Sequence, residues 1–163
     1  MKRINVLVFV AIFNLTVAQN IKQEKKAIKN VVAQFSQSII KKDSATFHSL
    51  FHTDTVNWIG IIRPRSQNKL QEIDPKNTKN YFHDTYRSFF KYIMTKEEKK
   101  ELFENVQIIN DDVVASVIFD YTFWSDKKMK NYGKELWQLI KTDGQWKITS
   151  VIFSYELAEF CNK

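Results

Sequence analysis

Thr142-Asp143-Gly144-Gln145-Trp146 joins two apolar runs within the segment from Glu104 to Glu156. Adjacent Asp and Gly residues accept the positive φ angles that a two-residue hairpin turn requires. The run after the turn, Trp146 to Tyr155, is rich in the β-branched and aromatic residues that favour strands. The chain is therefore predicted to end in an antiparallel hairpin.

Residues 113–124 alternate in the way that a strand with one buried face requires. One face is uniformly apolar and carries Val113, Ala115, Val117, Phe119, Tyr121 and Phe123. The other face mixes apolar and polar side chains and includes Asp120. In the next strand Glu135 and Trp137 share one side, and Leu136 and Gln138 share the other. The pattern predicts antiparallel strands but leaves open which face lines a pocket.

The first eighteen residues have the features of a secretory signal peptide. Lys2 and Arg3 precede an apolar run from Ile4 to Leu15, and Thr16-Val17-Ala18 forms a small-residue cleavage pattern before Gln19. The run is shorter than the roughly 20 residues of a membrane span, although an uncleaved anchor is the alternative.

We therefore expect residues 1–18 to be removed and residues 19–163 to form a single domain. The mature protein would be exported, periplasmic or secreted, without stable insertion into a membrane.

The net charge of +7 raises the question of a nucleic-acid partner. Export argues against one, and the lysines of the Lys96–Lys100 segment alternate with acids as on a solvated helix. Attraction of an anionic small ligand is a weaker alternative. Cys161 is the single cysteine, so an intramolecular disulfide is excluded. We expect no nucleic-acid partner.

Earlier in the chain, the spacing of apolar residues predicts helices. The expected elements are an amphipathic helix over residues 21–40, a short helix capped by Asp43 or Ser44, a strand from Val56 to Ile62, an irregular loop or lid from Arg63 to Asn80, and a third helix from Tyr81 to Met94.

Two segments resemble the nuclear transport factor 2-like superfamily. The segment from Lys42 to Trp58 is similar to its helix-to-first-strand signature, and that from Leu136 to Ile148 is similar to its final hairpin. The resemblance implies an α+β fold in which a curved antiparallel sheet is wrapped by about three N-terminal helices into a cone with an interior pocket. It also implies that a homodimer often forms through the sheet. The superfamily includes ketosteroid isomerase, scytalone dehydratase and SnoaL-type polyketide cyclases, together with ligand-binding domains.

Steroid isomerisation requires a carboxylate base and an oxyanion hole made of a tyrosine and a protonated acid. Matching the shared signatures places Phe35, Ile59 and Leu136 at these three positions. A hydrocarbon side chain can neither accept a proton nor donate a hydrogen bond. Glu135 is adjacent, but the strand alternation places it on the opposite face. This chemistry is therefore not expected.

A lyase- or cyclase-like enzyme would need other acid–base residues, and the candidates are Asp120, His83 and Tyr86. Asp120 lies among apolar neighbours, where a charge is costly unless it is paired. The alternatives are that Asp120 meets water or pairs with Lys134 across the hairpin, and that His83 occupies an exposed helix position.

His48 and His52 are four residues apart, which is a metal-ligand spacing on a helix. No third ligand follows at a recognisable position, so we expect neither a metal site nor a cofactor.

Aromatic residues make up 14% of the chain and can line a pocket or fill a core. The candidates for ligand contact are Trp58, Tyr86, Phe90, Gln138 and Phe153. We expect an exported domain that binds a small, largely apolar molecule without catalysis. The alternatives are the lyase- or cyclase-like enzyme and a module that self-associates or binds a partner through its sheet.

Overall fold

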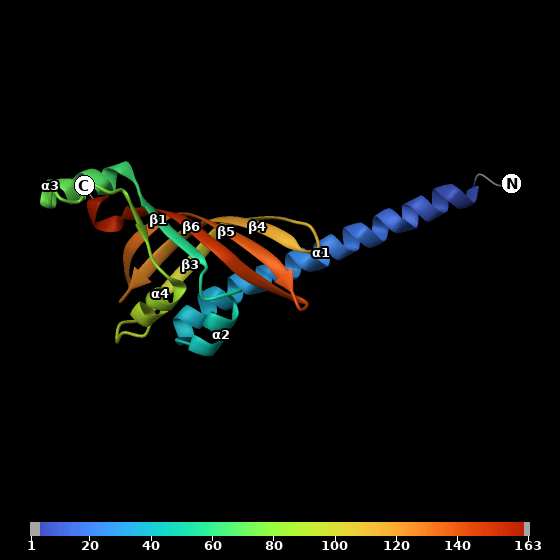
Figure 1. Ribbon diagram of the computed structural model, residues 1–163, viewed down its shortest axis with the longest axis horizontal. Helices are drawn as coiled ribbons and strands as arrows, with labels where there is room; N and C mark the ends of the chain where they lie inside the picture. Colours follow the sequence, from blue (N-terminus) through green and yellow to red (C-terminus); the bar gives the residue numbers. More distant parts are fainter. Residues whose placement is uncertain (1–3, 162–163) are drawn as a thin grey trace.

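The computed structural model describes residues 4–161, with side chains described from residue 21 onward (Figure 1). The elements in chain order are α1 (Ile4–Lys41), α2 (Ser44–Ser49), β1 (Asn57–Ile62), α3 (Pro64–Ile73), β2 (Tyr81–His83), α4 (Tyr86–Ile93), β3 (Lys99–Asn110), β4 (Val114–Ser125), β5 (Lys128–Thr142), β6 (Gln145–Leu157) and the 3-10 turn η1 (Ala158–Phe160).

The predicted signal peptide spans residues 1–18. Residues 1–3 lie outside the described residues, and the side chains of residues 4–18 are not described. Cleavage after Ala18 stays a prediction. Within the described part of the chain, no helix has the length and apolar character needed to cross a membrane.

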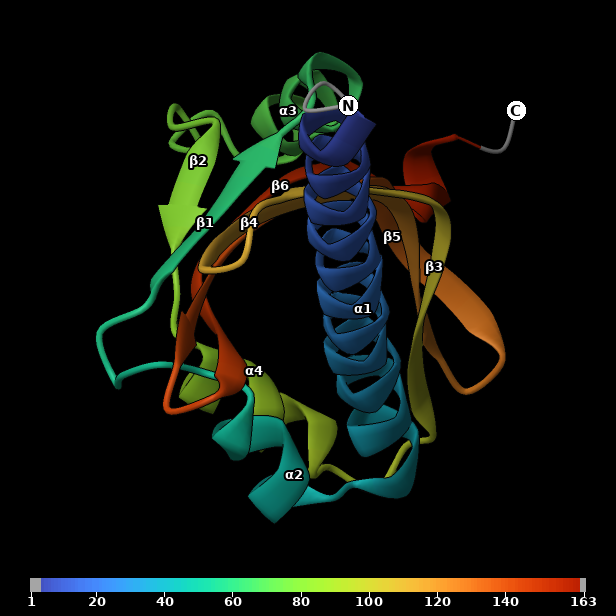
Figure 2. The same ribbon diagram turned by 90° about the vertical axis from the view of Figure 1, so that its right-hand side faces the viewer.

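The six strands form one sheet in the order β2-β1-β6-β5-β4-β3. Strands β3 to β6 are antiparallel neighbours, whereas β1 lies parallel to β6 and antiparallel to β2. The expected antiparallel sheet is thus mixed, because the first strand is placed beside the last. Figure 2 shows the sheet arching over α1, with α2 and α4 at the open side of the arch, also on the concave side of the sheet. This is the predicted α+β cone.

The turn between β5 and β6 has the predicted geometry. Asp143 and Gly144 have φ angles of 51° and 74°, and the flanking pair is Thr142 and Gln145. Both central residues lie in the left-handed region, as a type I′ hairpin turn requires.

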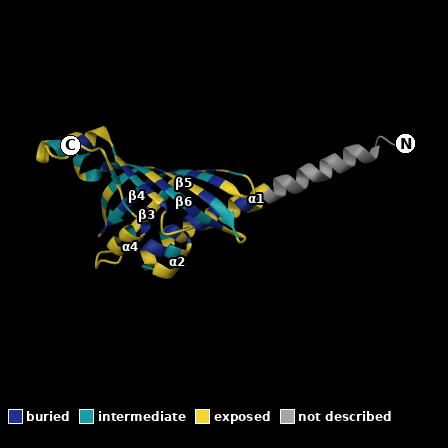
Figure 3. Cartoon of the chain, in the orientation of Figure 1, coloured by how far each residue is buried: buried dark blue, intermediate teal, exposed yellow. Residues whose placement is uncertain are grey.

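The core lies between the concave face of the sheet and α1. Phe35 and Trp137 are fully buried, with ring centroids 4.8 Å apart, and Phe47 packs 5.0 Å from Phe35. Val113, just before β4, is 51% exposed. From Ala115 onward the apolar face predicted for residues 113–124 turns inward, so buried positions alternate with partly exposed ones along β4 (Figure 3). Each such side chain contributes about 1.5–3 kcal/mol through burial.

Glu24 ties α1 to the terminal hairpin. Its carboxylate accepts a 2.6 Å hydrogen bond from Lys141 Nζ and a 2.8 Å bond from Trp146 Nε1. The hydrogen bonds to Lys141 and Trp146 lower the pKa of Glu24 against the opposing effect of its burial. The carboxylate thus stays charged while it satisfies a buried indole.

Two local predictions were wrong. The segment expected to be an irregular loop contains α3, because Pro64 stands at its first turn, where a missing N–H costs nothing. The helix expected from Tyr81 begins only after Thr85, whose side chain accepts a hydrogen bond from Ser88 N. Residues 81–83 instead form β2 along the edge of β1, where tyrosine and phenylalanine suit a strand.

Candidate functional site

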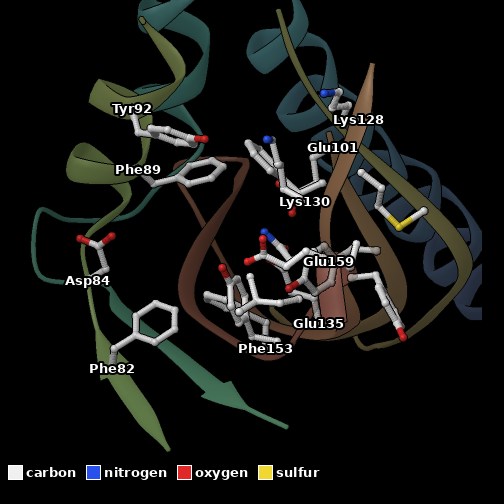
Figure 4. Close-up of a pocket in the computed structure, with 18 of the residues that line it drawn as sticks. Phe82, Asp84, Phe89, Tyr92, Glu101, Lys128, Lys130, Glu135, Phe153 and Glu159 are labelled. Atoms are coloured by element: carbon white, nitrogen blue, oxygen red, sulfur yellow. The ribbon is translucent and has the colours of Figure 1, made fainter. Parts of the chain in front are cut away.

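A cavity of about 970 Å³ opens between the concave face of the sheet and α4 (Figure 4). All six strands and α4 contribute to its wall, and nine of the twenty lining residues are aromatic. The aromatic residues that matter here are Trp58, Phe82, Phe89, Tyr92, Phe123 and Phe153. Figure 4 shows Phe82, Phe89 and Tyr92 along one wall, with Glu101 and Glu135 across the cavity from them.

Strand pairing brings the two acids into the same space. Glu101 on β3 pairs with Phe123 on β4, and Glu135 on β5 pairs with Phe119 on the same strand. Tyr121 lies between these two positions of β4. Because residues two apart share a face, all of these side chains turn to the buried side of the sheet. The acids therefore come from strands that are separated in the sheet by β4.

Both acids are almost completely buried, with exposures of 5% for Glu101 and 3% for Glu135. Trp137 Nε1 donates a 2.6 Å hydrogen bond to Glu135 Oε1. The carboxyl group of Glu101 forms neither a hydrogen bond nor an ion pair with any residue in the part of the chain that the structure describes. One acid is thus anchored, and the other is free to meet a ligand.

Burial raises the pKa of Glu135 to about 8, although the hydrogen bond from Trp137 acts in the opposite direction. Burial, followed by repulsion from Glu135, raises the pKa of Glu101 well above its usual range. Ionising either buried group is unfavourable, so both carboxyls bind protons near neutral pH.

Tyr121 adds a third polar group between the acids. Its hydroxyl donates a 3.0 Å hydrogen bond to the carbonyl oxygen of Ser154. Burial, followed by repulsion from Glu135 and Glu101, raises the pKa of Tyr121, so this residue stays a phenol. A protonated carboxyl can donate a hydrogen bond or a proton to a ligand, and an ionised one can pair with a cation.

Gly60 on β1 makes room for two of the aromatic walls. A Cβ atom at this position would lie 2.3 Å from Cζ of Phe82 and 2.9 Å from Cζ of Phe153. The two rings, whose centroids are 5.8 Å apart, therefore cross over the bare backbone of β1. Any larger residue would push them into the cavity.

The predicted ligand contacts divide between three regions. Trp58 and Phe153 line the cavity, and their contact with a ligand stays a prediction. Tyr86 and Phe90 lie in the core instead, and the Tyr86 hydroxyl donates a 3.0 Å hydrogen bond to Asp54 Oδ1. Gln138 lies on the outer face of the sheet, where its side-chain oxygen accepts a hydrogen bond from Ser116.

The predicted acid–base residues do not come together. Asp120 lies on the outer face, where it is bound by Lys134 Nζ at 2.5 Å and by Asn105 Nδ2 at 2.8 Å. His83 is exposed on β2, and Tyr86 is buried away from the cavity lining. The alternative expected from the sequence, in which Asp120 pairs with Lys134 across the hairpin, is confirmed. The hypothesis that Asp120 faces the pocket is wrong, because the mixed face of β4 is the convex face.

His48 and His52 also separate. His48 packs beside Tyr86 and Phe90, and burial lowers its pKa, whereas His52 is exposed. In the described residues, no three His, Cys, Asp or Glu side chains are grouped so that they could hold a metal ion.

Sequence reasoning missed Glu101 and Glu135 as site residues. The family match places Leu136 at the inward acid position and Glu135 on the opposite face, and this assignment is wrong. Leu136 is 39% exposed on the outer face, and Ile59 lies opposite the exposed Ile152 on that same face. The match of Ile59 and Leu136 to the base and acid positions of ketosteroid isomerase therefore says nothing about the chemistry of the cavity. The sequence does carry a signal for an inward Glu135, because Glu135 shares a strand face with Trp137 and Leu139, which are both apolar.

No protein-family model and no curated protein matches the chain. Solved structures do match it. A nuclear transport factor 2-like protein with a cystatin-like fold from Novosphingobium aromaticivorans aligns over 90% of both chains, with a TM-score of 0.62 and 8% identity. The chain has the nuclear transport factor 2-like fold.

Two further solved structures that match the chain carry activity names. A proposed scytalone dehydratase from Novosphingobium aromaticivorans is 17% identical, with a TM-score of 0.62 over 85% of this chain and 87% of the other. A proposed dehydratase from Streptomyces avermitilis is 15% identical, with a TM-score of 0.60 over 84% of this chain and 99% of the other. At these identities the similarity establishes the fold alone.

Proposed function

We propose that the cavity of this nuclear transport factor 2-like domain binds a small, largely apolar molecule. The observation that carries this proposal is the aromatic lining of the cavity, formed by side chains from β1, β2, β4, β5, β6 and α4. Cavities of a few hundred to about 1,000 Å³ with mostly apolar walls are typical of small-molecule sites.

The few polar groups of the cavity support a defined binding orientation. Glu101, Glu135 and Tyr121 converge from three neighbouring strands, whereas Trp58, Phe89 and Phe153 offer flat apolar surfaces. A ligand with one polar end and one apolar end matches this division. We propose export on the sequence of residues 1–18 alone.

Thermal unfolding in the presence of a library of lipophilic metabolites tests the proposal. A ligand at 100 times its Kd stabilises the folded state by about 2.7 kcal/mol, which raises the melting temperature measurably. Trp58→Ala and Phe153→Ala should reduce this rise. Trp124→Ala, which removes an aromatic residue from the outer face, should leave the rise unchanged. Flat melting curves across the library would refute ligand binding.

Proton-transfer catalysis is the second candidate function, and the position of Glu135 beside the cavity favours it. Its pKa of about 8 lies near the working pH that general acid–base catalysis requires. A ligand found by the melting screen, placed in D₂O with the protein, should exchange its acidic C–H protons faster than in buffer. Glu135→Gln should abolish this acceleration. Exchange at the buffer rate would show that the site binds without chemistry.

The outer face of the sheet supports a proposal of self-association. Ile118, Leu136 and Ile152 lie in register across three strands, and the last two are 39% and 40% exposed. Such a row of exposed aliphatic side chains suits the face of a homodimer.

A further inference from the structure

Acidic residues outnumber basic ones around the cavity, although basic residues predominate in the whole chain. The sequence carries a net charge of +7, yet the charged residues that line the cavity are Asp84, Glu101, Glu135 and Glu159 against Lys128 and Lys130. Both lysines are exposed, whereas two of the acids are buried. When the two buried acids ionise, the cleft carries an excess of negative charge, which attracts cations.

The buried acids have no positive partner within the described residues. Lys99 lies two residues before Glu101 on the same face of β3, but its ammonium group is bound to Glu97 at 3.1 Å and packs 4.5 Å from the Tyr92 ring centroid. Tyr121 and Tyr155 add only neutral hydroxyls, because burial raises the pKa of each. A buried carboxylate without a countercharge is costly.

The walls opposite the acids are suited to a cation. Phe82, Phe89 and Tyr92 face Glu101 and Glu135 across the cavity (Figure 4), and Trp58 lies 5.2 Å from Phe89, measured between ring centroids. Aromatic faces attract ammonium groups, most strongly when water is excluded. Carboxyls on one side and aromatic faces on the other together describe a site for an organic ammonium ion.

We propose that the ligand of this cavity is an organic cation, whose ammonium group sits between Glu101 and Glu135 while its apolar substituent contacts the aromatic wall. This inference rests on the proposed function and adds the charge of the ligand. The cation supplies the partner that Glu101 lacks, and the two carboxyls release protons as it binds.

Three probes of similar size separate the effects of charge and shape. Phenyltrimethylammonium carries a charge that does not titrate, tert-butylbenzene is its neutral isostere, and 4-tert-butylbenzoate carries the opposite charge. Isothermal titration calorimetry at about pH 9 should show the cation binding at least about tenfold tighter than the isostere, a difference of about 1.4 kcal/mol. The preference should shrink toward pH 6, because the carboxyls must then lose protons.

Matched variants locate the effect. Glu101→Gln and Glu135→Gln keep the shape of the protonated side chains, so the isostere should bind as before while most of the preference for the cation disappears. Asp120→Asn, an acid on the outer face, should keep the full preference. Titrations of the unmodified protein in two buffers of different ionisation enthalpy provide a readout without mutation, since binding of the cation should release protons near pH 7.5.

Equal binding of the cation and the isostere, or a preference that survives both Gln variants, would overturn the inference while leaving the proposed function in place. Tighter binding of the benzoate would also overturn it and assign recognition to Lys128 and Lys130. No binding of any probe, together with a flat melting screen, would refute the proposed function itself.

Discussion

Trp137 Nε1 donates a 2.6 Å hydrogen bond to Oε1 of Glu135, two residues away on the same face of β5. Trp137 is fully buried against Phe35 and Phe119, so the donor cannot turn away. The bond fixes the orientation of the Glu135 carboxyl and leaves its second oxygen for the cavity. The most buried tryptophan of the core thus positions an acid of the site.

Glu135→Gln should alter the pH dependence of stability. The folded-state pKa of Glu135 is raised from 4.5 to about 8, so the folded protein holds a proton that the unfolded chain has lost within this window. Its contribution to stability is therefore present below pH 4.5 and is lost as the pH rises toward 8. Glutamine stays neutral, so the variant should be more stable than the wild type by a few kcal/mol, at about 1.4 kcal/mol per pKa unit, above pH 8.

Urea unfolding at several pH values measures this difference. The free energies of unfolding of the two proteins should differ by less than about 1 kcal/mol at pH 5, because Glu135 is then also neutral in the folded wild-type protein. Asp120→Asn serves as the exposed control and should show no gain at high pH. An unchanged difference between Glu135→Gln and wild type from pH 5 to pH 9 would contradict a raised pKa at this site.

Gly60→Val should close part of the cavity. Its side chain would displace the Phe82 and Phe153 rings from above β1, at a cost of about 1–3 kcal/mol in stability. The melting shift caused by any cavity ligand should fall. Gly144→Asn is the matched control, because nothing lies within 4 Å of a Cβ there and asparagine tolerates its φ of 74°. A full ligand shift in Gly60→Val would place binding elsewhere.

Glu24→Ala should loosen α1 from the terminal hairpin. The change leaves the buried Trp146 Nε1 without an acceptor, which costs about 1–3 kcal/mol. Because the folded-state pKa of Glu24 is lowered, the destabilisation should be complete at neutral pH and should shrink as the pH falls below the unfolded value of 4.5.

Chemical denaturation checks the Glu24 prediction, and Lys22→Ala, at an exposed position of the same helix, should change stability by no more than about 0.5 kcal/mol. A loss for Glu24→Ala no larger than that of Lys22→Ala would rule out the anchoring role.

Leu136→Lys should disrupt the proposed homodimer. A lysine at the centre of the Ile118, Leu136 and Ile152 row would place a charge in the apolar interface. Sedimentation velocity should show a concentration-dependent dimer for the wild type and for Lys79→Glu, an exposed site in the loop between α3 and β2, but a monomer for Leu136→Lys. A wild-type protein that stays monomeric at all concentrations would exclude the dimer.

The local pattern of the chain was sufficient for most of the fold. The Asp143-Gly144 turn and the alternation over residues 113–124 led to the correct hairpins, because turn angles and strand faces depend on neighbouring residues. The same reasoning failed for Pro64–Ile73, which reads as polar and irregular. Ser66 in that helix is held by a 2.8 Å hydrogen bond to Glu156, far along the chain, and this contact is not visible in the local pattern.

The sequence by itself determined that Glu135, Trp137 and Leu139 share a face, and that Asp120 and Gln138 lie on mixed faces. Only the tertiary structure decided which of those faces is concave. That choice depends on the packing of α1 against the sheet and on the pairing of β3, β4 and β5, which bring Glu101 and Glu135 to one cavity. A period of two separates the faces of a strand, but the direction in which a sheet curves is set by contacts between distant segments.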